Sequence, residues 1–345
     1  MLETEFIKID PENINMDAMR LAGEIIAGGG LVAFPTETVY GLGASAVDSG
    51  AAEKIYAAKG RPSDNPLIVH VCSFEQIEEL AENIPAYAKK LMQSFMPGPL
   101  TLILKKKSCI PDEVTANMDT VGIRFPSNPV AAALIKCSGV PIAAPSANIS
   151  GKPSPTTARD VMEDMNGKIE CIIDGGSCSV GVESTILDAS GERPVLLRPG
   201  GITVDMIKEI CPELKIDSHV LKSVAPDEQP KCPGMKYKHY APDAEVTVIE
   251  GEMENVRAKI NELLKENKGR VTGVLTMYDS AYDDAVIINA GRQNSEYARN
   301  LFSDLREFDR LGVEVVFAEF CENDGVGLAV KNRLYKSAGG RVIHV

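Results

Sequence analysis

One twelve-residue stretch, KGRPSDNPLIVH from Lys59 to His70, combines two fixed cations, an amide and a histidine. Proline disfavours a helical conformation in the residue before it, so the two prolines predict a stiff, extended loop directly after a helix. Such a loop would hold the side chains of Lys59 and Arg61 in place before a polyanion arrives. The alternative is a plain helix terminus, with Lys59 in the last turn before Gly60, where a cation complements the helix dipole. This stretch by itself leaves both interpretations open.

A second polar stretch, TETVYGLG from Thr36 to Gly43, follows a short apolar run that predicts a buried strand. Ligands of open α/β sheets lie at the carboxyl ends of strands. The polar side chains at this end would be those of Thr36, Glu37, Thr38 and Tyr40. Glycines at 41 and 43 would allow the backbone to approach a ligand closely. An exposed turn is the alternative interpretation.

A single arginine, Arg124, stands among apolar neighbours in the strand-like sequence TVGIRFP. Arginine is almost never buried unless it is paired, and its planar fork fits a carboxylate or a phosphate. An internal salt bridge to one of the many acidic residues would explain the pattern equally well. The sequence therefore predicts an anionic partner for Arg124 without deciding between a ligand and a side chain.

The loop PSANISGKPSPT, from Pro145 to Thr156, is rich in small residues that let amides and hydroxyls approach an anion. It does not match a Walker A loop, because Ser146 replaces the first glycine and Pro153 follows the lysine. Further along, the motifs GVEST and LLRPG place Ser184 and Arg198 at expected strand ends. By contrast, we interpret the strand in MPGPLTLILKK as structural, since strands that end in lysines usually just reach solvent.

The composition narrows the class of protein. The net charge is −13, from 49 acidic and 36 basic residues, which disfavours extensive coating by nucleic acid. Eight cysteines occur without a CxxC pair, which argues against a zinc ribbon or a disulfide scaffold. The first residues lack the features of a signal peptide, and no apolar run approaches the ~18 residues of a membrane span. We expect a reducing, cytoplasmic setting.

Short apolar runs alternate with helical periodicity, for example a helix expected over residues 51–58 before a strand over 67–71. This alternation predicts an α/β fold. We expect three parts, with a catalytic domain in residues 1–212, a proline-containing linker in 213–243 and a smaller Rossmann-like α/β domain in 244–345. The last part has no GxGxxG after its first strand, so dinucleotide binding is not supported.

Seven motifs in this order closely resemble the YrdC-type threonylcarbamoyl-AMP synthases, in their longer form with a C-terminal domain. They are TETVYGLG, KGRPSDNPLIVH, VGIRFP, PSANISGKPSPT, GVEST, LLRPG and MKYKHYAP. The resemblance implies a twisted YrdC-like α/β sheet domain with an anion-binding concavity. It also implies a nucleotidyltransferase that joins L-threonine, bicarbonate or carbon dioxide and ATP into threonylcarbamoyl-adenylate and releases pyrophosphate. That product feeds the machinery that makes N6-threonylcarbamoyladenosine in tRNA.

The resemblance also assigns site residues. The ATP contacts it implies are Lys59, Arg61, Asn65, Thr120, Ser146, Asn148, Ser154, Arg198 and the linker residue Tyr237. Those to threonine are Thr38, His70, Arg124, Ala144 and Ser184. Catalysis would rest mainly on Lys59 and Arg61. No cluster of metal-ligating residues is visible, so we expect Mg²⁺ to be held mainly by the ATP phosphates and water. The alternative to an enzyme is a protein that binds double-stranded RNA or tRNA.

Overall fold

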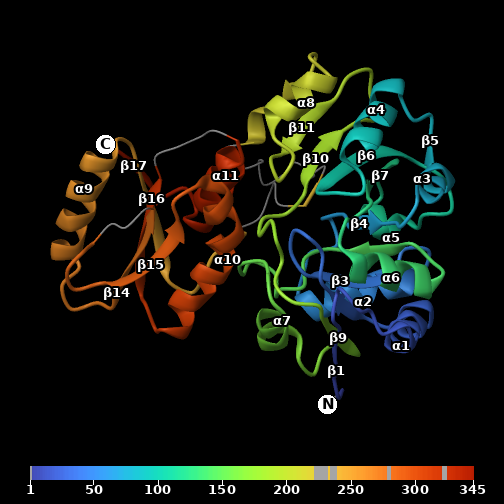
Figure 1. The fold of residues 1–345 in the computed structure, drawn as a ribbon, viewed down its shortest axis with the longest axis horizontal. Helices are drawn as coiled ribbons and strands as arrows, with labels where there is room; N and C mark the ends of the chain where they lie inside the picture. Colours follow the sequence, from blue (N-terminus) through green and yellow to red (C-terminus); the bar gives the residue numbers. More distant parts are fainter. Residues whose placement is uncertain (1, 221–231, 234–238, 278–280, 321–324) are drawn as a thin grey trace. The chain divides into compact units, whose positions relative to one another are not determined.

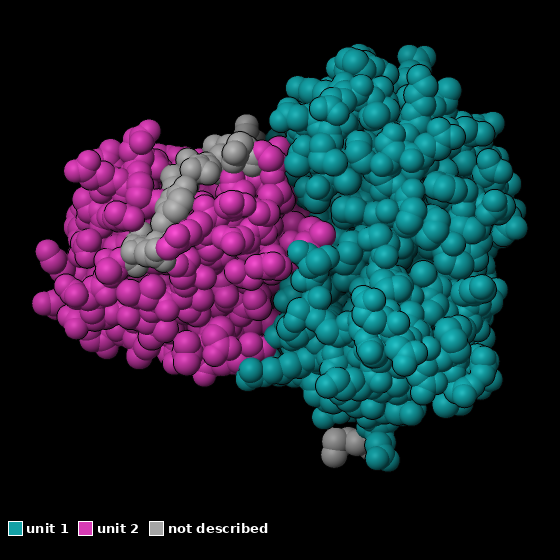
Figure 2. Space-filling view, in the orientation of Figure 1, with its two compact units in different colours: residues 1–150, 154–179, 183–237 teal, residues 151–153, 180–182, 238–345 magenta. Residues whose placement is uncertain are grey.

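The structure is a computed structural model that describes residues 2–220, 232–233, 239–277, 281–320 and 325–345. It divides into two compact units, coloured separately in Figure 2. The first unit comprises residues 1–150, 154–179 and 183–237. The second comprises residues 238–345 together with the short segments 151–153 and 180–182. The expected linker, residues 213–243, begins with a two-residue strand, Lys215–Ile216, and a 3₁₀ turn, Ser218–Val220, and most of its remainder lies outside the described residues.

The first unit is built on one mixed, twelve-stranded sheet in the order β1-β9-β2-β3-β8-β4-β7-β6-β10-β11-β12, with β5 paired to β6 (Figure 1). Its strands are β1 Glu5–Lys8, β2 Val32–Phe34, β3 Gly41–Ser45, β4 Ile68–His70, β5 Ala81–Glu82, β6 Leu100–Lys106, β7 Thr120–Arg124, β8 Ile142–Ala144, β9 Cys171–Asp174, β10 Thr185–Asp188, β11 Val195–Arg198 and β12 Lys215–Ile216. The sheet contains both parallel and antiparallel pairs, so it is not the purely parallel sheet of a doubly wound fold.

The helices of the first unit are α1 Met16–Ala27, α2 Ser49–Lys59, α3 Phe74–Leu80, α4 Ala86–Phe95, α5 Asp112–Thr115, α6 Pro129–Ser138, α7 Ala158–Met165 and α8 Val204–Ile210. The helix expected over residues 51–58 is confirmed as α2, and the strand expected over 67–71 is confirmed as β4. Helix α2 begins at the capping residue Asp48 and ends at Gly60, which adopts the left-handed conformation that glycine tolerates best. Lys59 does lie in its last turn.

The prediction for Gly41 and Gly43 was wrong. Both lie in β3, a strand that we did not predict, where their missing side chains make room for protein rather than ligand. A Cβ at Gly43 would lie 2.7 Å from Ile142 Cγ2 and 2.8 Å from Phe34 Cε1. A Cβ at Gly41 would lie 3.2 Å from the Phe34 ring. These glycines therefore allow β3 to pack against the Phe34 side chain in the core.

The second unit contains a five-stranded sheet in the order β15-β14-β16-β13-β17, with every described pair parallel. Its elements are β13 Glu245–Glu250, α9 Met253–Glu266, β14 Thr272–Met277, β15 Val286–Gly291, α10 Asn294–Arg310, β16 Val315–Phe320, α11 Gly327–Ser337 and β17 Val342–His344. Helix α10 buries an apolar face that includes Tyr297, Leu301 and Phe308. Together, the two units confirm the α/β class predicted from the sequence.

Two helices that we did not predict carried recognisable signals. Asn128 caps α6 and Pro129 follows at its first turn, an arrangement that favours helix initiation. Thr157 and Asp160 form a reciprocal capping box at the start of α7. Among the described residues, no helix is both long and apolar enough to cross a membrane.

Candidate functional site

The mixed sheet brings several predicted site residues to one edge. His70 and Arg124 end the parallel strands β4 and β7 and are direct partners in the register. Strand β6 is antiparallel to β7, so its Thr101 pairs with Arg124. Strand β10 is parallel to β6, which places Ser184, the residue just before β10, at the same edge. Because β11 is antiparallel to β10, its last residue, Arg198, also reaches this edge.

Arg124 lies at the centre of a buried, charged group. Its Nη2 atom is 2.8 Å from Glu37 Oε1, and the two side chains are only 5% and 8% exposed. The same Nη2 donates to Thr36 Oγ1 at 3.4 Å, and the hydroxyls of Thr36 and Thr38 are 2.9 Å apart. The internal salt bridge considered from the sequence is therefore present, and its acid comes from the loop after β2.

The structure makes His70 a neutral side chain. Burial, followed by the nearby charge of Arg124, lowers the pKa of its imidazole to about 3. Its Nδ1 atom is 3.1 Å from the carbonyl oxygen of Ile68, and the ring packs edge-on against Phe34. A neutral imidazole next to an arginine can hydrogen-bond a ligand hydroxyl without adding a second positive charge.

Ser184 and Arg198 form a second hydrogen-bonded group at this edge. The Arg198 guanidinium donates from Nε and Nη2 to the Ser184 carbonyl oxygen at 3.1 and 3.0 Å. The Ser184 hydroxyl is also 2.7 Å from Thr101 Oγ1. Our interpretation of this strand as purely structural missed Thr101. The signal was a single hydroxyl in the apolar run LTLIL, where a buried polar group needs a partner.

Lys59 connects the helix terminus to the PSAN loop. Its ammonium donates to the Ser146 carbonyl oxygen at 2.5 Å and also to the Asn148 carbonyl oxygen. The Ser146 hydroxyl in turn donates to Asn148 Oδ1 at 2.5 Å. Three residues from two distant motifs are thus brought together around one buried cation, which is 2% exposed. Both interpretations of Lys59 are compatible with this arrangement.

Arg61 stiffens the loop that contains it. Its guanidinium donates to the carbonyl oxygens of Asn65 at 3.3 Å and Pro66 at 3.1 Å. The Asn65 side chain is buried, and its Oδ1 atom has no hydrogen-bond partner among the described residues. The loop is not extended as expected, because the Asn65 amide donates to the Pro62 carbonyl oxygen at 3.4 Å and closes a turn, which Arg61 braces.

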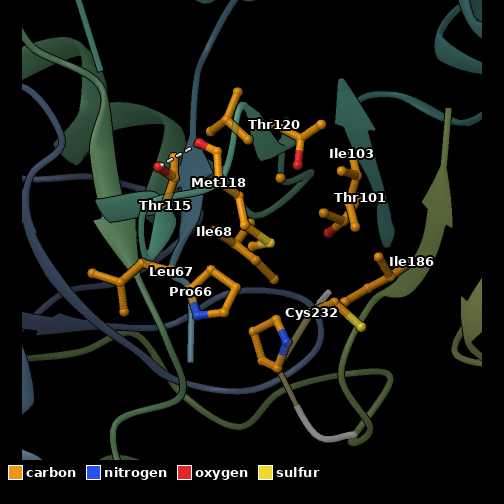
Figure 3. Close-up of a pocket in the computed structure, with 13 residues that line it drawn as sticks. Pro66, Leu67, Ile68, Thr101, Ile103, Thr115, Met118, Thr120, Ile186 and Cys232 are labelled. Carbon is orange, nitrogen blue, oxygen red and sulfur yellow. Dashed lines mark hydrogen bonds between the residues drawn. The ribbon is translucent and has the colours of Figure 1, made fainter. Parts of the chain in front are cut away.

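A largely apolar pocket adjoins these groups (Figure 3). Thr120, a predicted ATP contact, lines it together with two further hydroxyl residues, Thr101 and Thr115. Cys232 and Pro233 from the expected linker also line it, and the Pro233 carbonyl oxygen accepts a hydrogen bond from Arg198 at 3.3 Å. The lining therefore combines apolar walls with a few hydroxyl groups.

Three predicted site residues remain. The Ser154 hydroxyl donates to Glu183 Oε1 at 2.6 Å, so a buried acid that we did not single out holds it. Ala144 ends β8, next to Ile68 of β4. Tyr237 lies outside the described residues.

The described part of the chain contains no group of three or more His, Cys, Asp or Glu side chains that could hold a metal ion. Two buried carboxylates lie near the predicted site: Glu37 forms an ion pair with Arg124, and Glu183 accepts from the Ser154 hydroxyl. This donor set does not form an all-protein cage, and it fits an ion that would be held mainly by a ligand's phosphates.

The fold and site together define a two-unit α/β protein whose mixed-sheet unit carries a buried, charged site. Residues 24–200 match the family described as telomere recombination. Residues 202–339 match the one described as threonylcarbamoyl-AMP synthase, C-terminal domain. The chain belongs to the threonylcarbamoyl-AMP synthase family, as its resemblance to the YrdC-type members predicted.

Similar proteins support this assignment over nearly the whole chain. A threonylcarbamoyl-AMP synthase of Pyrococcus abyssi is 52% identical, over 97% of this chain and 98% of the relative. A threonylcarbamoyl-AMP synthase of Bacillus subtilis is 49% identical over 91% of this chain and 90% of the relative. The crystal structure of P. abyssi Sua5 complexed with L-threonine matches with a TM-score of 0.95 at 50% identity. The match covers 99% of this chain and 100% of that chain. E. coli YciO has a TM-score of 0.52 at 26% identity and covers 58% of this chain and 96% of its own.

Proposed function

We propose that the protein synthesises L-threonylcarbamoyladenylate from L-threonine, bicarbonate or carbon dioxide and ATP, with release of pyrophosphate. The observation that carries this proposal is the similarity to threonylcarbamoyl-AMP synthases over nearly the full length of both chains. The gathering of His70, Arg124 and Ser184 at one sheet edge supports it, because these residues were assigned to threonine from the motifs alone. In reaction class the enzyme would be a nucleotidyltransferase.

Threonine would bind around Arg124. The guanidinium would hold the amino-acid carboxylate with paired hydrogen bonds, which are the strongest an arginine makes. Thr38 and the neutral His70 would recognise the hydroxyl, and a site built to hydrogen-bond that hydroxyl rejects the isosteric valine. Ser184 and the backbone of Ala144 would complete the contacts.

ATP would bind along the other side of the site. Thr120, Asn65, Ser154, Arg198 and Tyr237 would contact the nucleotide. Lys59 and Arg61 would neutralise charge on the phosphates while a carbamate oxygen attacks the α-phosphorus in line and pyrophosphate leaves. Such a transfer depends on positioning and charge stabilisation more than on a protein nucleophile.

Mg²⁺ would contact mainly the phosphates and water and would neutralise charge on the leaving pyrophosphate. We further propose that the product passes to the tRNA threonylcarbamoyl-transfer machinery. The protein would act in the cytoplasm, and any contact of its own with tRNA would be weak or indirect.

The direct test is pyrophosphate release by the purified protein with ATP and Mg²⁺, omitting threonine and bicarbonate in turn. We expect release only when both are present. Valine in place of threonine is the matched control, and it should be turned over at a small fraction of the rate. Release that continues without threonine or without bicarbonate would contradict the proposed reaction.

A further inference from the structure

Glu37 carries a buried carboxylate for which the resemblance gave no role. The residue is 7% exposed, and neither of its oxygens has a hydrogen-bond partner among the described residues, although Oε1 lies 2.8 Å from Arg124 Nη2. The Nε atom of Arg124 is likewise buried without a partner in the described chain. One ion pair therefore leaves two acceptors and one donor without hydrogen bonds.

Such a set is unusual in a protein interior. Buried polar atoms are nearly always hydrogen-bonded, and those that are not require an explanation such as a ligand. The neighbouring groups do not supply the missing bonds. The Thr36 hydroxyl is shared with Thr38 and the Val39 carbonyl oxygen, and His70 faces the Ile68 carbonyl oxygen.

The two Glu37 oxygens and Arg124 Nε, which have no hydrogen-bond partner in the described chain, are complementary to the charged groups of an amino acid. A carboxylate would accept from the unpaired Arg124 Nε, while an ammonium would donate to the unpaired oxygens of Glu37. One positive and one negative side chain at contact distance match a zwitterion of zero net charge. His70 adds no further charge, because burial and Arg124 lower the pKa of its imidazole to about 3.

We propose that Glu37 binds the α-amino group of threonine while Arg124 holds its carboxylate. The spacing of the two side chains then matches the spacing of the amino and carboxylate groups of the ligand. This inference rests on the proposed function and extends its threonine site by one residue. Glu37 thereby fixes the position of the nitrogen that must meet the carbon of bicarbonate or carbon dioxide. The ammonium gives up two protons to solvent as the N–C bond to carbon dioxide forms, and the resulting carbamate nitrogen keeps one N–H, so the contact to Glu37 persists.

The alternative is that Glu37 only orients Arg124. In that case its loss would weaken every ligand carboxylate equally, whatever lies on the neighbouring carbon. A direct contact predicts a different result, because only ligands with an ammonium would be affected. The two cases separate in a cycle that changes the protein at Glu37 and the ligand at its amino group.

The experiment is calorimetric binding of L-threonine, and of the 2,3-dihydroxybutanoate that has a hydroxyl in place of the amine, to wild type and Glu37→Gln. A hydrogen bond between charged groups predicts that wild type prefers threonine by about 10- to 100-fold. We expect Glu37→Gln to lose most of that preference through weaker threonine binding. Binding of the hydroxy analogue should not weaken, because its carboxylate no longer has to compete with Glu37 for Arg124.

The matched control is Glu319→Gln. Glu319 is another buried acid, whose carboxylate accepts from the Met277 amide and the Tyr282 hydroxyl in the second unit. The Glu319→Gln substitution should leave the affinities for threonine and for the hydroxy analogue unchanged. An equal loss for the two ligands in Glu37→Gln, or tighter threonine binding, would overturn the proposal.

Two further outcomes, a variant that does not fold and a wild type that does not bind threonine, bear on different claims. Should Glu37→Gln fail to fold, the wild-type ligand pair still decides, because equal affinity for threonine and the hydroxy analogue contradicts an ammonium contact. A wild-type protein that binds no threonine would instead refute the proposed function on which this inference rests.

Discussion

The two sides of the predicted site treat their cations differently. On the nucleotide side, Lys59 donates to carbonyl oxygens of the loop that contains Ser146, and Arg61 donates to carbonyl oxygens of its own loop. On the amino-acid side, Arg124 faces a carboxylate and keeps its Nε atom without a partner among the described residues. The first arrangement fixes loops in place, whereas the second leaves buried hydrogen-bonding capacity unused.

This difference suggests how each side meets its ligand. The carbonyl oxygens that accept from Lys59 and Arg61 carry no net charge, so these contacts do not neutralise the two cations. Arg124 is already neutralised by Glu37, so a bare carboxylate would have to compete with that acid. A zwitterion would not, because it brings a positive group for Glu37. The comparison therefore predicts separable effects of variants on the two sides.

Arg61→Ala should have the largest effect on turnover. Removing this cation takes away both transition-state charge stabilisation and the brace of the loop, and we expect kcat to fall roughly 10³-fold. Pyrophosphate release measures the loss, and circular dichroism shows whether folding is intact. Arg61→Lys is the control, since it keeps the charge without the fork and should lie in between. A fully active Arg61→Ala variant would remove Arg61 from the site.

Arg124→Ala should act mainly on threonine. We expect the KM for threonine to rise about 100-fold, as a paired, charged contact is lost. Because Glu37 would be left as an uncompensated buried charge, the free energy of unfolding should also fall by about 3 kcal/mol. Urea unfolding measures the second effect.

The double variant Arg124→Ala, Glu37→Gln sharpens this comparison. It removes both charges, so it should unfold at higher urea than Arg124→Ala alone while still binding threonine poorly. A double variant no more stable than the single one would show that the buried charge is not what destabilises it.

His70 makes stability depend on pH. The folded pKa of its imidazole, about 3, lies below the ordinary 6.5, so the unfolded chain takes up the proton first. Its contribution to the free energy of unfolding is complete above pH 6.5 and falls by about 1.4 kcal/mol per pH unit below it. His70→Asn should remove this slope between pH 6 and 5, measured by urea unfolding at each pH. Parallel curves for the two proteins would contradict a neutral His70.

Thr101→Val should have the smallest effect. It removes the hydroxyl that contacts Ser184, and we expect a loss of about 1 kcal/mol in stability with a few-fold rise in the KM for threonine. Thr101→Ser keeps the hydroxyl and should retain the wild-type KM. An unchanged KM in Thr101→Val would limit Thr101 to a structural role.

Much of the fold could be predicted because its signals are local. The apolar periodicity before Lys59 and the left-handed preference of Gly60 mark the end of α2. The role of Gly41 and Gly43 could not be predicted, because a small residue allows ligand approach and tight packing equally well. Only the position of the Phe34 ring decided between them.

The sequence by itself determined which residues carry charge and hydrogen-bonding groups, where the chain is stiff and which family motifs occur in order. It also indicated that Arg124 needs an anionic partner. Only the tertiary structure decided that this partner is Glu37, that Thr101 meets Ser184 and that Lys59 meets the PSAN loop. The physical reason is that turns and helix ends follow from local backbone preferences, whereas contacts between distant residues depend on strand order and register.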